Sequence, residues 1–282
     1  MNINATYKLN NNIEIPKLGY GTFQTPDNQS GIEAIVNALK VGYRHIDTAQ
    51  SYKNEESVGK AIELAGVARE ALFITTKIAN SVDGFEETIN ALDESLKKLR
   101  LDYLDLVLIH WPSPKRFRDH WQLRNSETWR ALEEYYKQGK IKAIGVSNFK
   151  KHHIVELLKT ATVVPAVNQI RLCPGDVDVQ TIDFCREYNM LLEGYSPLGQ
   201  GLVFDIKEIK SLADKYHKNV AQIVLKWSLQ MGFLPLPKSV TLERIQANID
   251  IFDFQLEEDD MTMLTNLTGR CGESKDPDSV PF

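Results

Sequence analysis

Short apolar runs alternate with amphipathic stretches along most of this 282-residue chain. Eight runs are almost continuously apolar, which is typical of strands buried on both faces of a parallel sheet. The polar opening, TYKLNNNIEIPKL, predicts a β-hairpin before the first of them. The eight predicted strands cover residues 18–23, 45–49, 72–78, 104–111, 143–148, 166–170, 191–197 and 233–239.

Helical periodicity occupies the segments between these strands. Apolar residues at steps of three and four recur over 85–99, 206–216 and 220–227, so each segment predicts a helix with one apolar face. Repeated strand–helix units favour an α/β fold, a single (β/α)8 TIM barrel over residues 1–282 with extra C-terminal helices. An open doubly wound sheet is the alternative, but it usually carries GxGxxG after its first strand. The nearest match, Gly19-Tyr20-Gly21, lacks the third glycine.

The composition narrows the choice of partners. Hydrophobic residues make up 43% and charged residues 25%, as in an ordinary globular protein with a full core. The net charge of −5 and the scattered basic residues argue against nucleic-acid binding. The opening MNINATYKLN lacks the apolar centre of a signal peptide, and no run reaches the ~18 apolar residues of a membrane helix. Three cysteines without a CxxC pair fit a cytoplasmic setting.

Polar side chains stand at the C-terminal ends of most predicted strands, which is where (β/α)8 barrels place their chemistry. One polar strand end usually means a capped helix or a wet rim, but several titratable groups at one face indicate a site. The residues concerned are Asp47, Lys77, His110, Ser147, Asn148, Asn168, Gln169, Lys238 and Ser239.

Asp47, Tyr52, Lys77 and His110 together suit proton delivery to a carbonyl group. A free tyrosine has a pKa of about 10 and is a poor acid at neutral pH. An adjacent ammonium lowers that pKa, a carboxylate keeps the lysine charged and in place, and a histidine can donate a hydrogen bond to the substrate oxygen. The alternative is a buried Asp47–Lys77 ion pair beside a core tyrosine. Because the set lacks a hydride, the chemistry needs a cofactor.

The last two strands predict a phosphate site. Such barrels often bind phosphate with these loops and a short helix N-terminus. Lys238 and Arg244 flank the start of the helix TLERIQAN and suit a phosphate dianion, although solvated surface residues are the alternative. Tyr195 offers a flat ring that can stack on a nicotinamide or cap the core. Pro197 and Gly199 fit a backbone that turns tightly around a ligand.

Five stretches resemble the motifs of the aldo-keto reductase family, in the family's order: GYRHIDTAQSYKNEESVG, ITTK, LVLIHWP, GVSNF and LPKSVTLERI. The chain is most similar to short-tailed prokaryotic members such as diketogluconate and glyoxal reductases. The resemblance implies a (β/α)8 barrel, often a monomer, that uses NADPH, oxidised to NADP+, to reduce small carbonyl compounds. It also implies that Tyr52 is the proton donor, that Lys77 paired with Asp47 lowers the tyrosine's pKa, and that His110 orients the carbonyl.

The family pattern also assigns the lining of the pocket. Substrate would contact Phe23, Tyr52, His110 and Trp111. A preference for NADPH over NADH would come from 2′-phosphate contacts with Lys238, Ser239 and Arg244. The residues expected at the cofactor are Gly21, Thr22, Phe23, Asp47, Ser147, Asn148, Gln169, Tyr195, Ser196, Pro197, Leu198, Gly199, Lys238, Ser239, Val240, Arg244 and Asn248.

Several positions depart from the family pattern. Arg171 and Cys173 replace an acid and a histidine at the rim. Ala247 leaves only Asn248 for the adenine amino group, which predicts cofactor binding weaker by roughly 1 kcal/mol. Ala79 stands where many members carry an aromatic residue, which predicts a wider pocket. Glu193, inside a strand, needs a partner that the sequence does not identify.

Three further expectations concern the surface. The basic loop after residue 111 either covers the site and favours acidic substrates or is simply solvated. The segment after residue 268 is short, and we expect it to add little to substrate selection. The pair His152-His153 is expected to face two ways on a helix as solvated surface, and no metal site is predicted.

Two other functions compete with carbonyl reduction. One is a non-enzymatic nicotinamide-binding sensor or regulatory subunit on the same barrel, against which the presence of all four catalytic positions argues. The other is a metal-dependent barrel hydrolase, which would need His and carboxylate ligands clustered at strand ends; the sequence offers only His110 and Asp47 there.

Overall fold

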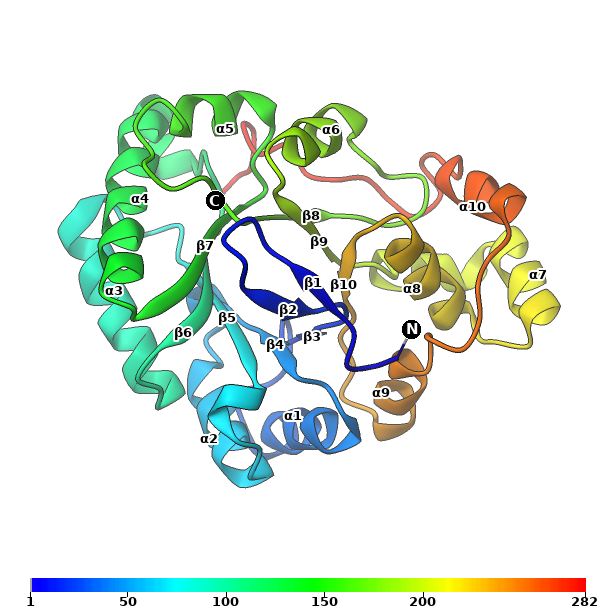
Figure 1. Ribbon diagram of the computed structural model, residues 1–282. Helices are drawn as coiled ribbons and strands as arrows, with labels where there is room; N and C mark the ends of the chain where they lie inside the picture. The colour runs from blue at the N-terminus through cyan, green and yellow to red at the C-terminus, as the bar shows by residue number, and fades with distance from the viewer. Residues whose placement is uncertain (1) are drawn as a thin grey trace.

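The fold is given by a computed structural model that describes residues 2–282. Eight parallel strands lie in chain order around a barrel (Figure 1). Backbone amides of Gly19 and Gly21 donate to the carbonyl oxygens of Pro235 and Pro237, at 3.2 and 3.0 Å, and so join the first barrel strand to the last. The strands are β3 (Tyr20–Gly21), β4 (His45–Asp47), β5 (Phe73–Ile78), β6 (Leu104–Ile109), β7 (Ile141–Ser147), β8 (Val167–Arg171), β9 (Leu191–Tyr195) and β10 (Leu234–Leu236).

Helices surround the barrel as an outer ring (Figure 1). Each helix predicted from periodicity is present, and within residues 2–282 none is long and apolar enough to cross a membrane. The α-helices are α1 (Gln29–Val41), α2 (Glu55–Ala65), α3 (Gly84–Leu99), α4 (Trp121–Lys137), α5 (Lys151–Leu157), α6 (Val179–Glu187), α7 (Lys207–Tyr216), α8 (Val220–Gln230), α9 (Leu242–Ile249) and α10 (Glu258–Thr265). Short 3-10 helices are η1 (Gln50–Tyr52), η2 (Arg69–Ala71), η3 (Lys115–His120) and η4 (Gly199–Asp205).

The predicted (β/α)8 barrel is therefore confirmed, and the open doubly wound sheet is wrong because the sheet closes. The strands read as continuous apolar runs because both faces are covered, and every residue of β5 and β6 is buried. Packing between neighbouring strands is close. A Cβ atom on Gly145 of β7 would lie 2.6 Å from the carbonyl oxygen of Val167 on β8, so this position has no room for a side chain.

The predicted hairpin is also present, as β1 (Thr6–Lys8) paired with β2 (Glu14–Pro16). It lies across the centre of the ring of strands (Figure 1). Ile15 packs with core residues such as Leu106 and Leu234. The Asn10 and Asn11 side chains donate to the carbonyl oxygens of Pro165, just before β8, and Lys142, near the start of β7. The hairpin thus closes the amino end of the barrel and leaves the carboxyl ends of the strands for a site.

Candidate active site

A cavity of about 1360 Å³ lies at the carboxyl ends of the barrel strands. Most residues that the sequence predicts for the site line it. These are Gly21, Phe23, Asp47, Tyr52, His110, Trp111, Ser147, Asn148, Gln169, Tyr195, Ser196, Pro197, Leu198, Gly199, Lys238, Ser239, Val240, Arg244 and Asn248. Lys77 and Thr22 do not line it and lie fully buried beneath it. Thr22 binds the backbone of Asp47, because both its amide and its hydroxyl donate to the Asp47 carbonyl oxygen.

Lys77 on β5 holds the centre of the site together. Its Nζ atom lies 2.6 and 2.8 Å from the two carboxylate oxygens of Asp47, at the end of β4. The same atom donates to the carbonyl oxygen of Thr48 at 3.0 Å and lies 3.2 Å from the phenol oxygen of Tyr52, on η1. Lys77 therefore contacts two of the three other residues that the sequence grouped with it by chemistry, Asp47 and Tyr52.

The electrostatics of this group are set by burial and by the ion pair. Burial alone lowers the pKa of Lys77, but Asp47 and Tyr52 together hold it above its ordinary value, so the ammonium is retained. Burial raises the pKa of Tyr52, and the Lys77 charge opposes that rise. The Lys77 charge thus acts on the Tyr52 pKa in the predicted direction, but burial raises that pKa by more than Lys77 lowers it.

His110 follows β6 and packs edge-on against Tyr52, with ring centroids 5.7 Å apart. Burial, and then the Lys77 charge, lower the pKa of His110 to about 3. The imidazole is therefore neutral at neutral pH and carries one N–H group to donate. It stands beside the phenol at the wall of the cavity, where both groups face the same small volume.

The ends of β7 and β8 form a hydrogen-bonded set. The Ser147 hydroxyl donates to the Gln169 carbonyl oxygen at 2.8 Å. Asn148, with a left-handed φ of 63°, donates through Nδ2 to the His110 carbonyl oxygen and accepts a 2.8 Å hydrogen bond from the Tyr195 hydroxyl. These bonds fix the ring of Tyr195 at the cavity wall.

The partner of Glu193 is Gln169. The Gln169 amide nitrogen donates to Glu193 at 2.7 Å and to Asp47 at 2.8 Å, and all three residues are buried. Gln169 thus connects Glu193 to the Asp47–Lys77 pair. The sequence placed Gln169 at the site but contained no signal for this bridge.

The other end of the cavity carries two cations. Lys238 and Arg244 are exposed, line the cavity and make no ion pair within residues 2–282. Burial lowers the pKa of Lys238. Ser239 lies between them, and its hydroxyl accepts a hydrogen bond from the Thr241 amide at the start of α9. An unpaired lysine and arginine beside a helix start can bind an anionic group.

Residues 269–282, the tail segment, also reach the cavity. This position argues against the expectation that the segment adds little to substrate selection. The Phe282 ring packs against Trp111 with centroids 5.3 Å apart, and both residues line the cavity. Lys115 and Arg118 of the basic loop donate to the carbonyl oxygens of Phe282 and Val280, each at 2.6 Å. The loop therefore binds the tail segment through the Lys115 backbone amide and the Arg118 guanidinium, while Lys115 and Arg116 are exposed.

Arg171 and Cys173, which depart from the family pattern at the rim, also contact the tail segment. Arg171 donates to the carbonyl oxygens of Cys271 and Gly272, and the Cys173 thiol donates to Cys271 at 3.5 Å. Ala79 does not line the cavity, so the structure gives no support to a pocket widened at that position. No local sequence pattern links residue 171 to residue 271, which is why this contact was not predicted.

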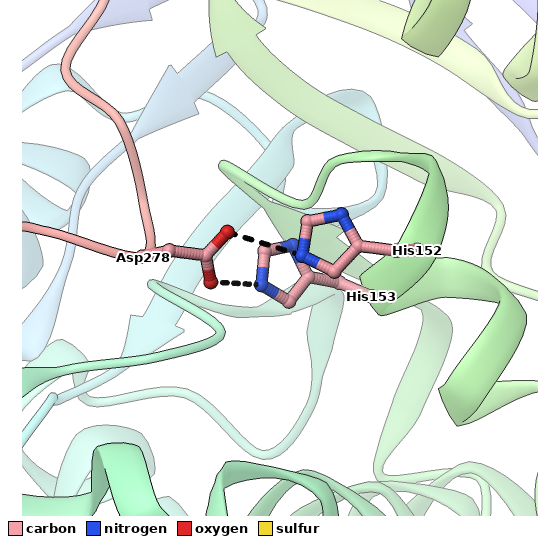
Figure 2. A group of neighbouring side chains, drawn as sticks. All are labelled: His152, His153 and Asp278. Carbon is pink, nitrogen blue, oxygen red and sulfur yellow. Dashed lines mark hydrogen bonds and ion pairs between the residues drawn. The ribbon is translucent and has the colours of Figure 1, made fainter.

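The interpretation of His152-His153 as solvated surface is right for the exposed His152 and wrong for the buried His153. Both imidazoles of α5 point at the carboxylate of Asp278 in the tail segment, at 3.1 and 2.9 Å (Figure 2). His153 is fully buried, and its Nδ1 atom accepts a hydrogen bond from the Lys150 amide. Nε2 therefore carries the hydrogen that is donated to Asp278 and is not free to ligate a metal. The group fastens the tail segment to α5, together with the Lys150–Asp276 ion pair at 2.7 Å.

Within residues 2–282, this is the one group of three His, Cys, Asp or Glu side chains close enough to hold a metal. It lies between α5 and the tail segment, and none of its three residues lines the cavity. The metal-dependent hydrolase would need such a cluster at the strand ends, and the described residues do not provide it.

Comparison with known proteins identifies the family. The family model described as "Aldo/keto reductase family" matches residues 17–268. The chain belongs to the aldo-keto reductase family. It is 46% identical to the glyoxal reductase of Bacillus subtilis (strain 168), covering 98% of each chain. It is also 46% identical to the methylglyoxal reductase DkgA of Escherichia coli (strain K12), covering 96% of each chain.

Among solved structures, this aldo-keto reductase superimposes on that of Bombyx mori in complex with NADP with a TM-score of 0.88 and 34% identity. That comparison covers 94% of this chain and 93% of the other. The family resemblance read from the sequence motifs is thus confirmed, and the protein is an oxidoreductase.

Proposed function

We propose that this aldo-keto reductase reduces aldehydes and ketones to alcohols, with NADPH as cofactor and Tyr52 as proton donor. The observation that carries the proposal is the contact of Tyr52 with Lys77, which is itself held by both oxygens of Asp47. An ammonium beside a phenol stabilises the phenolate, and therefore favours transfer of the phenol proton to the carbonyl oxygen. His110, neutral and adjacent, can donate a hydrogen bond to that same oxygen.

The lining of the cavity fits NADPH, which supplies a hydride when bound. Tyr195 presents a ring for the nicotinamide, and the adjoining backbone of 196–199 would lie along the pyrophosphate. The exposed cations Lys238 and Arg244 lack acidic partners within residues 2–282 and would hold the 2′-phosphate with Ser239. The complex of the Bombyx mori relative with NADP supports the choice of cofactor.

The remaining predicted contacts complete the cofactor site. Ser147, Asn148 and Gln169 would face the carboxamide, and Asn248 would face the adenine. Ala247, which also lines the cavity, offers the adenine no acceptor, so the weaker adenine contact stays a prediction.

We further propose that small α-oxoaldehydes are the substrate class. Two relatives with 46% identity over nearly their full length are a glyoxal reductase and a methylglyoxal reductase. Phe23, Trp111 and Phe282 give the part of the cavity near Tyr52 apolar walls. Such walls suit a small carbonyl compound whose oxygen bonds Tyr52 and His110.

Turnover of methylglyoxal and 4-nitrobenzaldehyde, followed as loss of NADPH absorbance, tests the proposal. Tyr52→Phe should reduce kcat by about a hundredfold or more while the Kd for NADPH stays within about twofold, because the ring is kept and the proton is lost. A variant that kept most of its turnover would refute Tyr52 as the acid. NADPH binding by the unaltered protein without oxidation by any carbonyl would favour the sensor instead.

A further inference from the structure

Gln169 bridges two buried carboxylates. Its Nε2 atom lies 2.8 Å from Oδ2 of Asp47 and 2.7 Å from Oε2 of Glu193. An amide nitrogen has two hydrogens, and these two bonds use both of them. The amide orientation is thereby defined, because the opposite orientation would place its carbonyl oxygen against the Asp47 carboxylate. Gln169 lines the cavity, and its Oε1 atom makes no hydrogen bond within residues 2–282.

The groups around Glu193 contain one cation for two acids. Lys77 provides that cation, and it is bound to both oxygens of Asp47. His45 lies 4.0 Å from Glu193 Oε1 and instead has its Nε2 atom 3.0 Å from the Thr75 hydroxyl. Burial, and then Lys77, lower the pKa of His45 to about 3, so this imidazole is neutral.

The neighbouring strands supply no other charge. On β10 the residues paired with β9 are Leu234, Pro235 and Leu236, which do not titrate. On β8 the facing group is the neutral amide of Gln169. A buried carboxylate without a cation is costly, and such a group takes up a proton instead. Burial and the nearby Asp47 raise the pKa of Glu193 to about 8, so it is protonated at neutral pH.

We propose that Glu193 is a positioning residue: in its protonated form it fixes the Gln169 amide with the carbonyl oxygen toward the cavity. In that orientation Oε1 of Gln169 is an acceptor for an N–H group, such as that of a carboxamide. Loss of the proton leaves a second anion next to the Asp47–Lys77 pair, which stabilises the Tyr52 proton and weakens the acid. This inference rests on the proposed function, because it concerns the same site.

The pH profile of kcat/KM for methylglyoxal tests the proposal with Glu193→Gln, a neutral side chain of the same shape. Unaltered protein should lose activity by up to about tenfold per pH unit above about pH 8. Glu193→Gln should keep its activity at neutral pH within about threefold and lose this alkaline decline, since nothing ionises at the position. Glu193→Ala, which frees the amide, should lose about tenfold or more at every pH.

The same alkaline decline in Glu193→Gln as in the unaltered protein would overturn the proposal, and so would equal activity of Glu193→Ala and the unaltered protein. Two measurements do not depend on turnover. The Kd for NADPH should change above about pH 8 in the unaltered protein but not in Glu193→Gln. The melting temperature of the unaltered protein should fall as the pH rises from about 4.5 to about 8 and then level off, because only the folded state keeps the Glu193 proton in that range, and Glu193→Gln should lack this decline. If no carbonyl is reduced, the proposed function fails, while these two measurements still decide the role of Glu193.

Discussion

Both carboxylate oxygens of Asp47 lie within hydrogen-bonding distance of the Lys77 ammonium, at 2.6 and 2.8 Å. Lys77 is fully buried, and its remaining contacts are the Thr48 carbonyl oxygen and the Tyr52 phenol. The ammonium therefore depends on one acid for its charge balance.

Asp47→Asn should damage both catalysis and stability. Without the carboxylate, the buried Lys77 loses its counter-charge and tends to lose its proton, so it no longer stabilises the Tyr52 phenolate. We expect kcat to fall by about 10²-fold or more. The free energy of unfolding should fall by about 3–5 kcal/mol, as for a buried pair with one partner removed. Chemical denaturation and steady-state kinetics measure the two effects, and Glu33→Gln, at an exposed acid on α1, is a control. Unchanged kinetics in Asp47→Asn would contradict this role.

Arg244→Ala should separate the two nicotinamide cofactors. A hydrogen bond to a charged group contributes about 1.5–3 kcal/mol, so the Kd for NADPH should rise by about ten- to a hundredfold. NADH has no 2′-phosphate, and its Kd should change by less than about twofold. Fluorescence titration measures both constants. Lys207→Ala removes a cation on α7 that does not line the cavity, and it should leave both unchanged. Equal losses for both cofactors in Arg244→Ala would rule out the phosphate contact.

Phe282→Ala should change substrate selection without changing cofactor binding. The Phe282 ring packs on Trp111 at the cavity, and an aromatic contact of this kind contributes about 0.5–1.5 kcal/mol. The KM for 4-nitrobenzaldehyde should rise by about two- to tenfold, while the KM for the smaller methylglyoxal changes less. Tyr188→Ala, at an exposed ring at the end of α6 that does not line the cavity, is the matched control. The same KM values before and after Phe282→Ala would show that the tail segment does not contact substrate.

The barrel and the centre of the site follow from local patterns in the sequence. In a parallel barrel, the strand order and the common direction bring all carboxyl ends to one face. Asp47, Lys77 and His110 each stand at or just after a strand end, so their convergence could be predicted without knowing any distance. Asp47 on β4 is paired with Thr75 on β5. Lys77 stands two residues further along β5, on the same face as Thr75, and its long side chain reaches the Asp47 carboxylate.

The tail segment could not be predicted in this way. Its contacts join residues far apart in the chain, such as Lys150 with Asp276 and Arg118 with Val280. Each depends on the path of an irregular segment, for which neither helical nor strand periodicity gives a signal. The bridge from Gln169 to Glu193 was missed for a related reason. A strand that is buried on both faces reads as a continuous apolar run. Its sequence therefore does not show which side chains point into the barrel and meet those of other strands.

The β1–β2 hairpin has a consequence for traffic through the molecule. The hairpin packs against core side chains such as Leu106 and Leu234 and covers the amino end of the barrel, and in barrels of this kind side chains fill the interior. Within residues 2–282, the cavity that contains Tyr52 is also lined by Trp111, Phe282 and Tyr195. A cofactor bound between Arg244 and Tyr195 would occupy part of this same cavity, so it would reduce the space that remains beside Tyr52 for a substrate.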